Sequence, residues 1–144
     1  MTLSFSNRQR KLPLDLSRLE KIAQLALPAI LASPGTDEAL LLNTLEVIEI
    51  TILSSREMGR VHRKFLDKPG PTDVITFPYG EILVCAEVAA EQAPLHDADF
   101  SDELALYVIH GLLHLHGYDD CSPRSAQRMA DRQANVLNYA LDQL

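Results

Sequence analysis

The chain has 144 residues and a formal net charge of −7, with 47% hydrophobic and 23% charged residues. These values exclude disordered, collagen-like and coiled-coil proteins, and they predict a single domain over residues 1–144. The longest apolar stretch is too short to span a bilayer, and with two cysteines and no secretory signal we expect a cytoplasmic protein without a membrane partner.

The first third of the chain predicts two strands separated by a helix. Residues 3–5 favour a short strand. Residues 15–33 favour a helix, because apolar side chains recur there at helical spacing. Ser17 and Glu20 resemble a capping box near the start of this helix. Residues 46–53 alternate between apolar and polar side chains and are rich in β-branched residues, which is typical of a strand.

A basic helix is predicted directly after the second strand. Ser54 and Glu57 resemble another capping box at its start. We expect Met58, Val61 and Phe65 to form the buried face of this helix. A different face carries three arginines, namely Arg56, Arg60 and Arg63.

A β-hairpin is predicted next, with residues 74–79 and 81–85 as its strands and Gly80 in the turn between them. Residues 87–92 favour a short helix. The hairpin adds two strands to the two predicted before it. Three or four strands with several helices make an α+β fold.

Two further helices are predicted in the last third of the chain. Residues 101–116 are largely apolar, which predicts a buried helix that ends at Gly117. Ser122 is expected to cap the last helix, which begins at Pro123 because proline is favoured at the first helical position.

The negative net charge argues against a nucleic-acid partner, whereas the distribution of basic residues argues for one. A protein that is acidic overall can still present a basic surface, because fields act over about 10 Å at moderate salt. Ten of the thirteen Lys and Arg residues lie in three short segments: Arg8, Arg10 and Lys11; Arg56, Arg60, Arg63 and Lys64; and Arg124, Arg128 and Arg132. For the last segment, a solvated helix face is the favoured interpretation.

The most informative pattern is a pair of histidines followed by a glycine and an aspartate. His110 and His114 are four residues apart on the predicted buried helix, so their side chains lie on one face, one turn apart. Gly117 allows the chain to turn back, and Asp120 can then approach both imidazoles. This is the ligand spacing of the long metalloprotease motif with its third histidine replaced by aspartate. The pattern predicts a metal site; two core histidines are the alternative.

His116 and Asp119 compete with Asp120 for the third position. His116 lies about 200° around the helix from His114, so it is expected to face away. In zinc peptidases the residue after the first histidine is glutamate, which acts as the general base. Here that residue is Gly111, which disfavours peptide hydrolysis.

Two separated segments resemble the YbeY-type endoribonucleases, a bacterial family of rRNA maturation. The segment from His110 to Asp120 supplies nearly all of the signature His-Gly-x-Leu-His-Leu-x-Gly-Tyr-Asp-His. Residues 62–78 resemble the family's Arg, short loop, Pro-Thr-Asp-Val and strand, and residues 80–85 its next strand. The likeness covers roughly residues 43–140. The departure is Asp120, where the family usually has a third histidine.

The resemblance implies a small mixed β-sheet flanked by helices, with the metal-binding helix at the centre. It implies a metal-dependent single-strand endoribonuclease that acts in 16S rRNA processing and ribosome biogenesis. One Zn²⁺ per chain would be held by His110, His114 and Asp120, and Arg63 would be the catalytic arginine of the cleft. The implied partners are rRNA and the small ribosomal subunit, with ribosomal proteins as further candidates.

Three other functions remain as alternatives. The first is a non-catalytic, rRNA-binding ribosome-assembly factor with a structural metal. The second is a zinc metallopeptidase-like hydrolase, which the missing glutamate disfavours. The third is a non-haem iron enzyme, because two histidines and a carboxylate also describe that facial triad.

Overall fold

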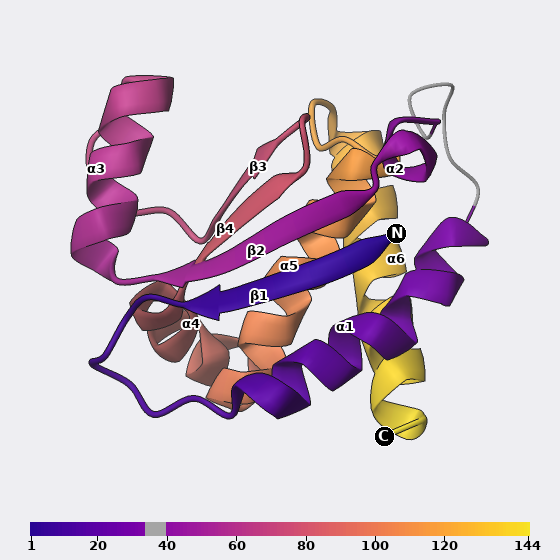
Figure 1. Ribbon diagram of the computed structural model, residues 1–144, viewed down its shortest axis with the longest axis horizontal. Helices are drawn as coiled ribbons and strands as arrows, with labels where there is room; N and C mark the ends of the chain where they lie inside the picture. The colour runs from indigo at the N-terminus through magenta and orange to yellow at the C-terminus, as the bar shows by residue number, and fades with distance from the viewer. Residues whose placement is uncertain (34–39) are drawn as a thin grey trace.

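The computed structural model describes residues 1–33 and 40–144. Four strands form one mixed sheet in the order β1-β2-β4-β3 (Figure 1). β1 (Thr2–Asn7) pairs parallel with β2 (Val47–Leu53), and β2 pairs parallel with β4 (Glu81–Cys85). β3 (Val74–Phe77) pairs antiparallel with β4, as the hairpin prediction expects.

Six α-helices are seen among the described residues. They are α1 (Leu16–Leu31), α2 (Leu40–Thr44), α3 (Ser55–Leu66), α4 (Ala86–Gln92), α5 (Phe100–Leu115) and α6 (Pro123–Asp142), with a short 3₁₀ helix at Ala93–His96. The single-domain α+β prediction is confirmed; α2 was not predicted. None of the described helices is long and apolar enough to cross a membrane.

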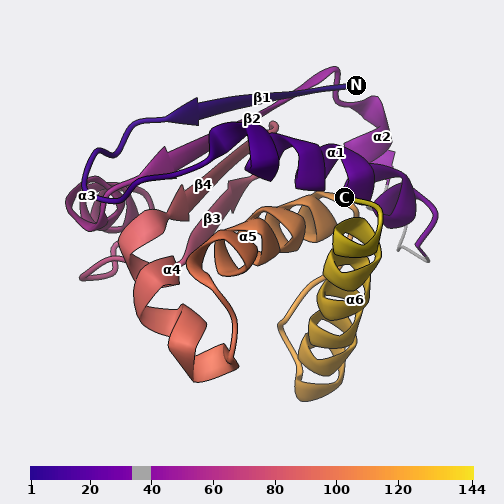
Figure 2. The ribbon, with the colours of Figure 1, turned by 90° about the horizontal axis from the view of Figure 1, so that it is seen from below.

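The core lies between one face of the sheet and α5, with α1 and α6 packed beside α5 (Figure 2). In β2 the alternation puts Ile48, Ile50 and Ile52 in this core, each fully buried. α5 is apolar on nearly all sides, so it is covered by the sheet and by helices together. The predicted central helix is therefore buried along most of its length.

α5 approaches the sheet closely at one glycine. A Cβ atom at Gly111 would lie 2.7 Å from Cγ2 of Ile82 on β4, closer than packed atoms come. Glycine is therefore needed for this contact, and the position cannot hold the glutamate that a zinc peptidase has there. The structure thus supplies a steric reason against that alternative.

Three local expectations are wrong. The N-cap of α1 is Asp15, whose carboxylate accepts from the Arg18 N–H, so Ser17 lies inside the helix. Ser54 does cap α3, but the Glu57 carboxylate pairs with Arg8 at 2.9 Å. Phe65 is 58% exposed, because it stands at the last turn of α3, where its ring meets Phe77 edge to face at the end of the outer strand β3.

The arginines of α6 do not form a simple solvated face. Arg132 Nε donates to Ser33 Oγ at 2.6 Å and so ties α6 to the end of α1. The Arg128 guanidinium lies over the Tyr118 ring, 5.5 Å from its centroid. Of the three, Arg124 is simply exposed.

Candidate metal centre

Two histidines project from successive turns of α5. The rings of His110 and His114 meet edge to face, with centroids 4.5 Å apart. Both side chains are about one quarter exposed, although most of their helix is buried. The spacing of four residues therefore places both rings at one opening in the packing, as predicted.

The chain reverses after α5 and brings a carboxylate back to the two rings. Gly117 adopts a φ of +98°, and the Tyr118 N–H donates to the Leu113 carbonyl at 3.0 Å. Asp120 Oδ2 then lies 4.0 Å from His110 Nε2 and 3.9 Å from His114 Nε2. The three donor atoms lie within 4.8 Å of one another, and this group could hold a metal ion.

The other ring nitrogens have partners that orient the imidazoles. His110 Nδ1 donates to Gln133 Oε1 on α6 at 2.7 Å, and His114 Nδ1 donates to the Tyr118 carbonyl at 3.0 Å. A proton on each Nδ1 leaves an unprotonated Nε2 directed at Asp120. Metal-binding histidines commonly use such outer partners to fix the tautomer.

Burial lowers the pKa of His114, and the neighbouring His110 lowers it further. His114 is therefore neutral near pH 7, which is the form that binds metals.

The three donor atoms also have nearly the spacing that a zinc ion requires. A tetrahedral zinc ion with bonds of about 2.0–2.1 Å holds neighbouring ligand atoms roughly 3.3 Å apart, so a small inward movement suffices. The residues fit a metal ion.

The two rival ligands lie elsewhere. His116 is 3% exposed, and its Nε2 donates to the Ser33 carbonyl at 3.1 Å, so this histidine joins α5 to the end of α1. Asp119 is exposed and accepts from the Cys121 N–H at 3.0 Å. Hydrogen bonds from Ser125 and Cys121 lower the pKa of Asp119. Neither residue belongs to the group of donors around His110.

A cavity of about 780 Å³ opens over the three donors. Its walls come from β3, from the end of α3 and from the loop between them. The lining includes Phe65, Leu66, Asp73, Phe77 and Pro78 together with His110, His114 and Asp120. The donors thus face a space large enough for part of a polymer substrate.

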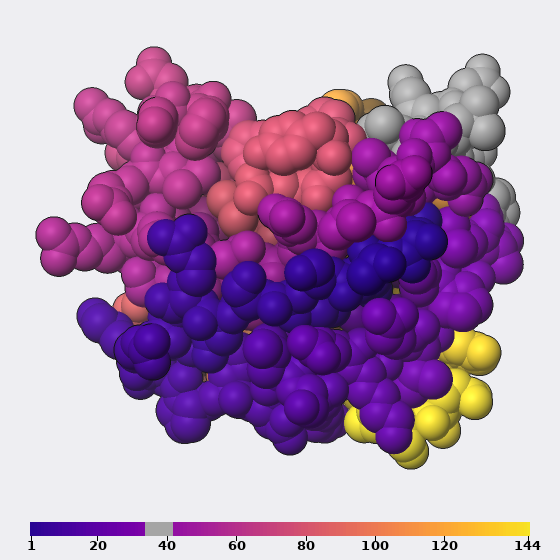
Figure 3. Space-filling view, in the orientation of Figure 1, coloured from indigo at the N-terminus to yellow at the C-terminus, as the bar shows by residue number. Residues whose placement is uncertain are grey.

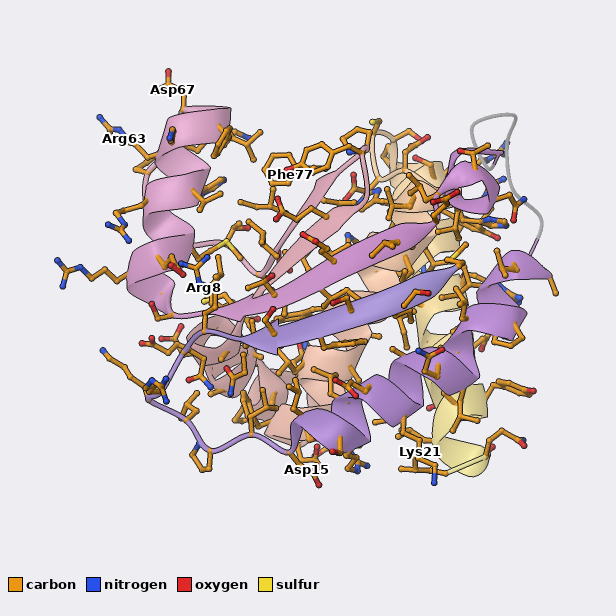
Figure 4. The ribbon with its side chains drawn as sticks, viewed as in Figure 1. Arg8, Asp15, Lys21, Arg63, Asp67 and Phe77 are labelled. Atoms are coloured by element: carbon orange, nitrogen blue, oxygen red, sulfur yellow. The ribbon has the colours of Figure 1, made fainter. Side chains whose placement is uncertain are left out.

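Arg63 is not brought to this cavity. Among the residues that the structure describes, Phe65 and Leu66 line it from α3, whereas Arg63 lies on the exposed side of that helix with Arg56, Arg60 and Lys64. In Figure 4 the Arg63 side chain points away from the sheet, and α3 stands between it and Phe77. The role of Arg63 as the catalytic arginine of the cleft, at the reacting phosphate, stays a prediction.

Sequence inspection missed Gln133, which orients His110. Gln133 is four residues after Met129 and three before Val136, both of which are buried. A polar side chain on an apolar helical stripe was the available signal. Such a residue indicates a buried hydrogen bond but does not show which residue is the partner.

Fold and site together define an α+β protein with a two-histidine, one-carboxylate centre on its central helix. A profile of the family described as Endoribonuclease YbeY matches residues 4–140. The chain belongs to this family, whose members are hydrolases that cut RNA. The match begins at residue 4, well before the motifs that carry the resemblance.

Individual proteins are also similar to this chain. Endoribonuclease YbeY of Thermobifida fusca is 28% identical over 154 residues, which cover 95% of this chain and 92% of that protein. The enzyme of Kineococcus radiotolerans is 34% identical over 107 residues, or 62% of each protein. The solution structure of TM1509 from Thermotoga maritima has a TM-score of 0.66 and 26% identity, covering 98% of this chain and 90% of that one.

Proposed function

We propose that this protein is a zinc-dependent endoribonuclease that cleaves single-stranded RNA during 16S rRNA maturation in the cytoplasm. The observation that carries the proposal is the group of His110, His114 and Asp120 at the base of an open cavity. Structural zinc sites are usually closed by four protein ligands, whereas catalytic sites use three and keep one position open. Three grouped donors among the described residues therefore favour catalysis over a purely structural metal.

The residues of the chain have separate tasks in this proposal. A zinc ion bound there would act as a Lewis acid toward a phosphoryl oxygen and would make coordinated water more acidic. His110 and His114 supply neutral nitrogen donors, and Gln133 and the Tyr118 carbonyl keep both rings in place. Asp120 supplies the negative charge. The basic face of α3 attracts RNA phosphates despite the negative net charge.

Asp120 gives a direct test of the donor set. We expect Asp120→His to keep the metal and to bind zinc more tightly, because imidazole suits zinc well. Asp120→Ala should lose more than the roughly 10–100-fold in affinity that removal of an outer partner costs. Zinc content of the purified proteins and competition with a zinc-binding dye measure both effects. Equal affinity of wild type and Asp120→Ala would show that Asp120 is not a ligand.

Single-turnover cleavage of an rRNA fragment by the same proteins tests the activity. Cleavage should follow metal content across wild type and the two Asp120 variants. A metal-loaded wild-type protein that binds the fragment without cutting it would favour an assembly factor with a structural metal. Iron rather than zinc in freshly purified protein would favour the non-haem iron alternative.

Arg63 tests how RNA is held. Its outward position on α3 supports contact with flanking phosphates better than contact with the reacting one. We expect Arg63→Ala to weaken RNA binding and to reduce the dependence of log K on log salt by about 1, with little change in the cleavage rate at saturating protein. Lys21→Ala is the matched control, because Lys21 lies on α1 at the opposite side of the molecule (Figure 4).

A large loss of the saturated cleavage rate in Arg63→Ala would instead support the sequence-based role at the reacting phosphate. Removal of one donor to a reacting phosphate costs roughly a hundredfold in rate. Binding titrations at several salt concentrations, followed by single-turnover rates, separate the two roles.

A further inference from the structure

Three aromatic side chains form a row in which a partly buried central ring is flanked by two exposed ones. Phe65 meets Phe77 edge to face with centroids 5.6 Å apart, and Phe77 stacks on Tyr79 at 5.5 Å and 19°. Phe65 is 58% exposed and Tyr79 is 69% exposed. We call Phe65, Phe77 and Tyr79 the aromatic row. Large exposed rings in contact with one another on a small protein commonly mark a binding surface.

The aromatic row borders the cavity of the metal centre. Phe65 and Phe77 line the same cavity as His110, His114 and Asp120, and Tyr79 continues the row beyond it. Figure 4 shows Phe77 at the β3 edge of the sheet, on the side of α3. In the space-filling view, α3 and the β3–β4 region form neighbouring parts of one face (Figure 3). A polymer with a reacting group at the three donors would thus pass over these rings.

Positive charge accompanies the rings. Lys64 Nζ lies 5.4 Å from the Phe65 centroid. Arg8, Arg60 and Lys64 line a neighbouring hollow of about 440 Å³ together with Phe65 and Phe77. Two acidic residues also line this hollow: Glu57 pairs with Arg8 at 2.9 Å, and Glu81 accepts from the Tyr79 hydroxyl at 2.6 Å. Within the part of the chain that the structure describes, Arg60 and Lys64 form no ion pair and are the cations open to a strand.

Exposed rings beside cations are the features with which proteins hold single-stranded nucleic acid. Bases offer flat faces to the rings, and phosphates offer charge to the cations. Every base has such a face, so contacts of this kind select unpaired strands with little regard to sequence.

We propose that the aromatic row stacks unpaired bases of the RNA strand beside the scissile phosphate. This inference rests on the proposed function and adds to it the reason for a single-strand preference. Stacking requires bases that have left a duplex, so a paired strand cannot use the row. Lys64 and Arg60 contact the phosphates between the stacked bases.

The test compares RNA with and without bases. Fluorescence anisotropy measures binding of a labelled short oligoadenylate and of an abasic oligonucleotide of the same length, and a gel confirms that both stay intact. The variants are Tyr79→Leu and Phe65→Leu, which keep apolar bulk and remove the ring. Tyr139→Leu is the control, because Tyr139 is 48% exposed on α6.

We expect each row variant to bind oligoadenylate about tenfold more weakly, which is within the range of one base–aromatic stack. Binding of the abasic strand should be unchanged, and Tyr139→Leu should behave as wild type on both. Equal losses on both strands, or no loss in either variant, would overturn the proposal. Thermal unfolding of each variant shows that the fold is intact.

Failure of the stacking proposal is distinguishable from failure of the proposed function. A wild-type protein that cleaves RNA yet binds oligoadenylate and the abasic strand equally well would overturn stacking alone. A wild-type protein that neither binds nor cleaves RNA would overturn both. A row that binds an apolar peptide instead of oligoadenylate would also overturn the proposal.

Discussion

Replacing His114 by alanine is expected to remove most of the bound metal and to lower RNA cleavage by roughly a thousandfold or more. A metal held by these donors would supply several kcal/mol of charge stabilisation in the transition state, and two remaining donors rarely hold an ion. The fold should survive, because alanine favours the helix and the His114 side chain is about one quarter exposed. Metal content and single-turnover cleavage measure the two effects.

His116 is the matched comparison, two residues away on the same helix. It is buried, and its ring donates to the Ser33 carbonyl rather than to the metal centre. His116→Ala should keep the metal but lose roughly 1–3 kcal/mol of unfolding free energy, because a buried carbonyl loses its donor. His116→Gln retains an N–H donor and should recover part of that stability.

The two substitutions therefore affect different properties. Metal loss in His116→Ala with an intact fold, together with retained metal in His114→Ala, would show that the ligand assignment is wrong. Loss of metal in both, with the two proteins still folded, would show that His116 also belongs to the site.

The elements of this fold could be predicted because their signals are local. The alternation of β2, the apolar run of α5 and the Ser122-Pro123 start of α6 each depend on neighbouring residues. Helix α2 was not predicted, because a segment of five residues is too short to show the hydrophobic periodicity of a helix. Phe65 was misplaced because helical spacing shows which side chains share a face, but not where the contact of that face ends.

The grouping of the three candidate donors could be predicted for the same reason, since all three lie within one helix and the turn that follows it. The cavity could not, because its walls come from α3 and β3, which meet α5 only through the tertiary fold. Gln133 and Arg63 show this difference. Gln133 binds His110 from α6, across a contact between two helices. Arg63 lies outside the cavity, although the family resemblance implied a position in the cleft.

A second large effect is expected at Gly111, where α5 meets β4. Gly111→Ala adds a Cβ that would lie 2.7 Å from Ile82 Cγ2, and Ile82 is fully buried and cannot swing away. Overpacking of this kind costs up to about 3 kcal/mol. Alanine stabilises a helix by about 1 kcal/mol relative to glycine, which offsets part of this cost. The free energy of unfolding should therefore fall by about 2 kcal/mol. Urea unfolding measures this change.

Gly59 provides the control for Gly111, because it is the other glycine that lies inside one of the described helices. A Cβ at Gly59 would find its nearest atoms at 3.8 Å, which is ordinary contact. Gly59→Ala should therefore be neutral or stabilise the protein by up to about 1 kcal/mol. Gly111→Ala should also weaken metal binding, because His110 precedes the displaced residue and moves with the helix. Unchanged stability in Gly111→Ala would mean that α5 and β4 separate freely, and that the close contact does not set the position of His110.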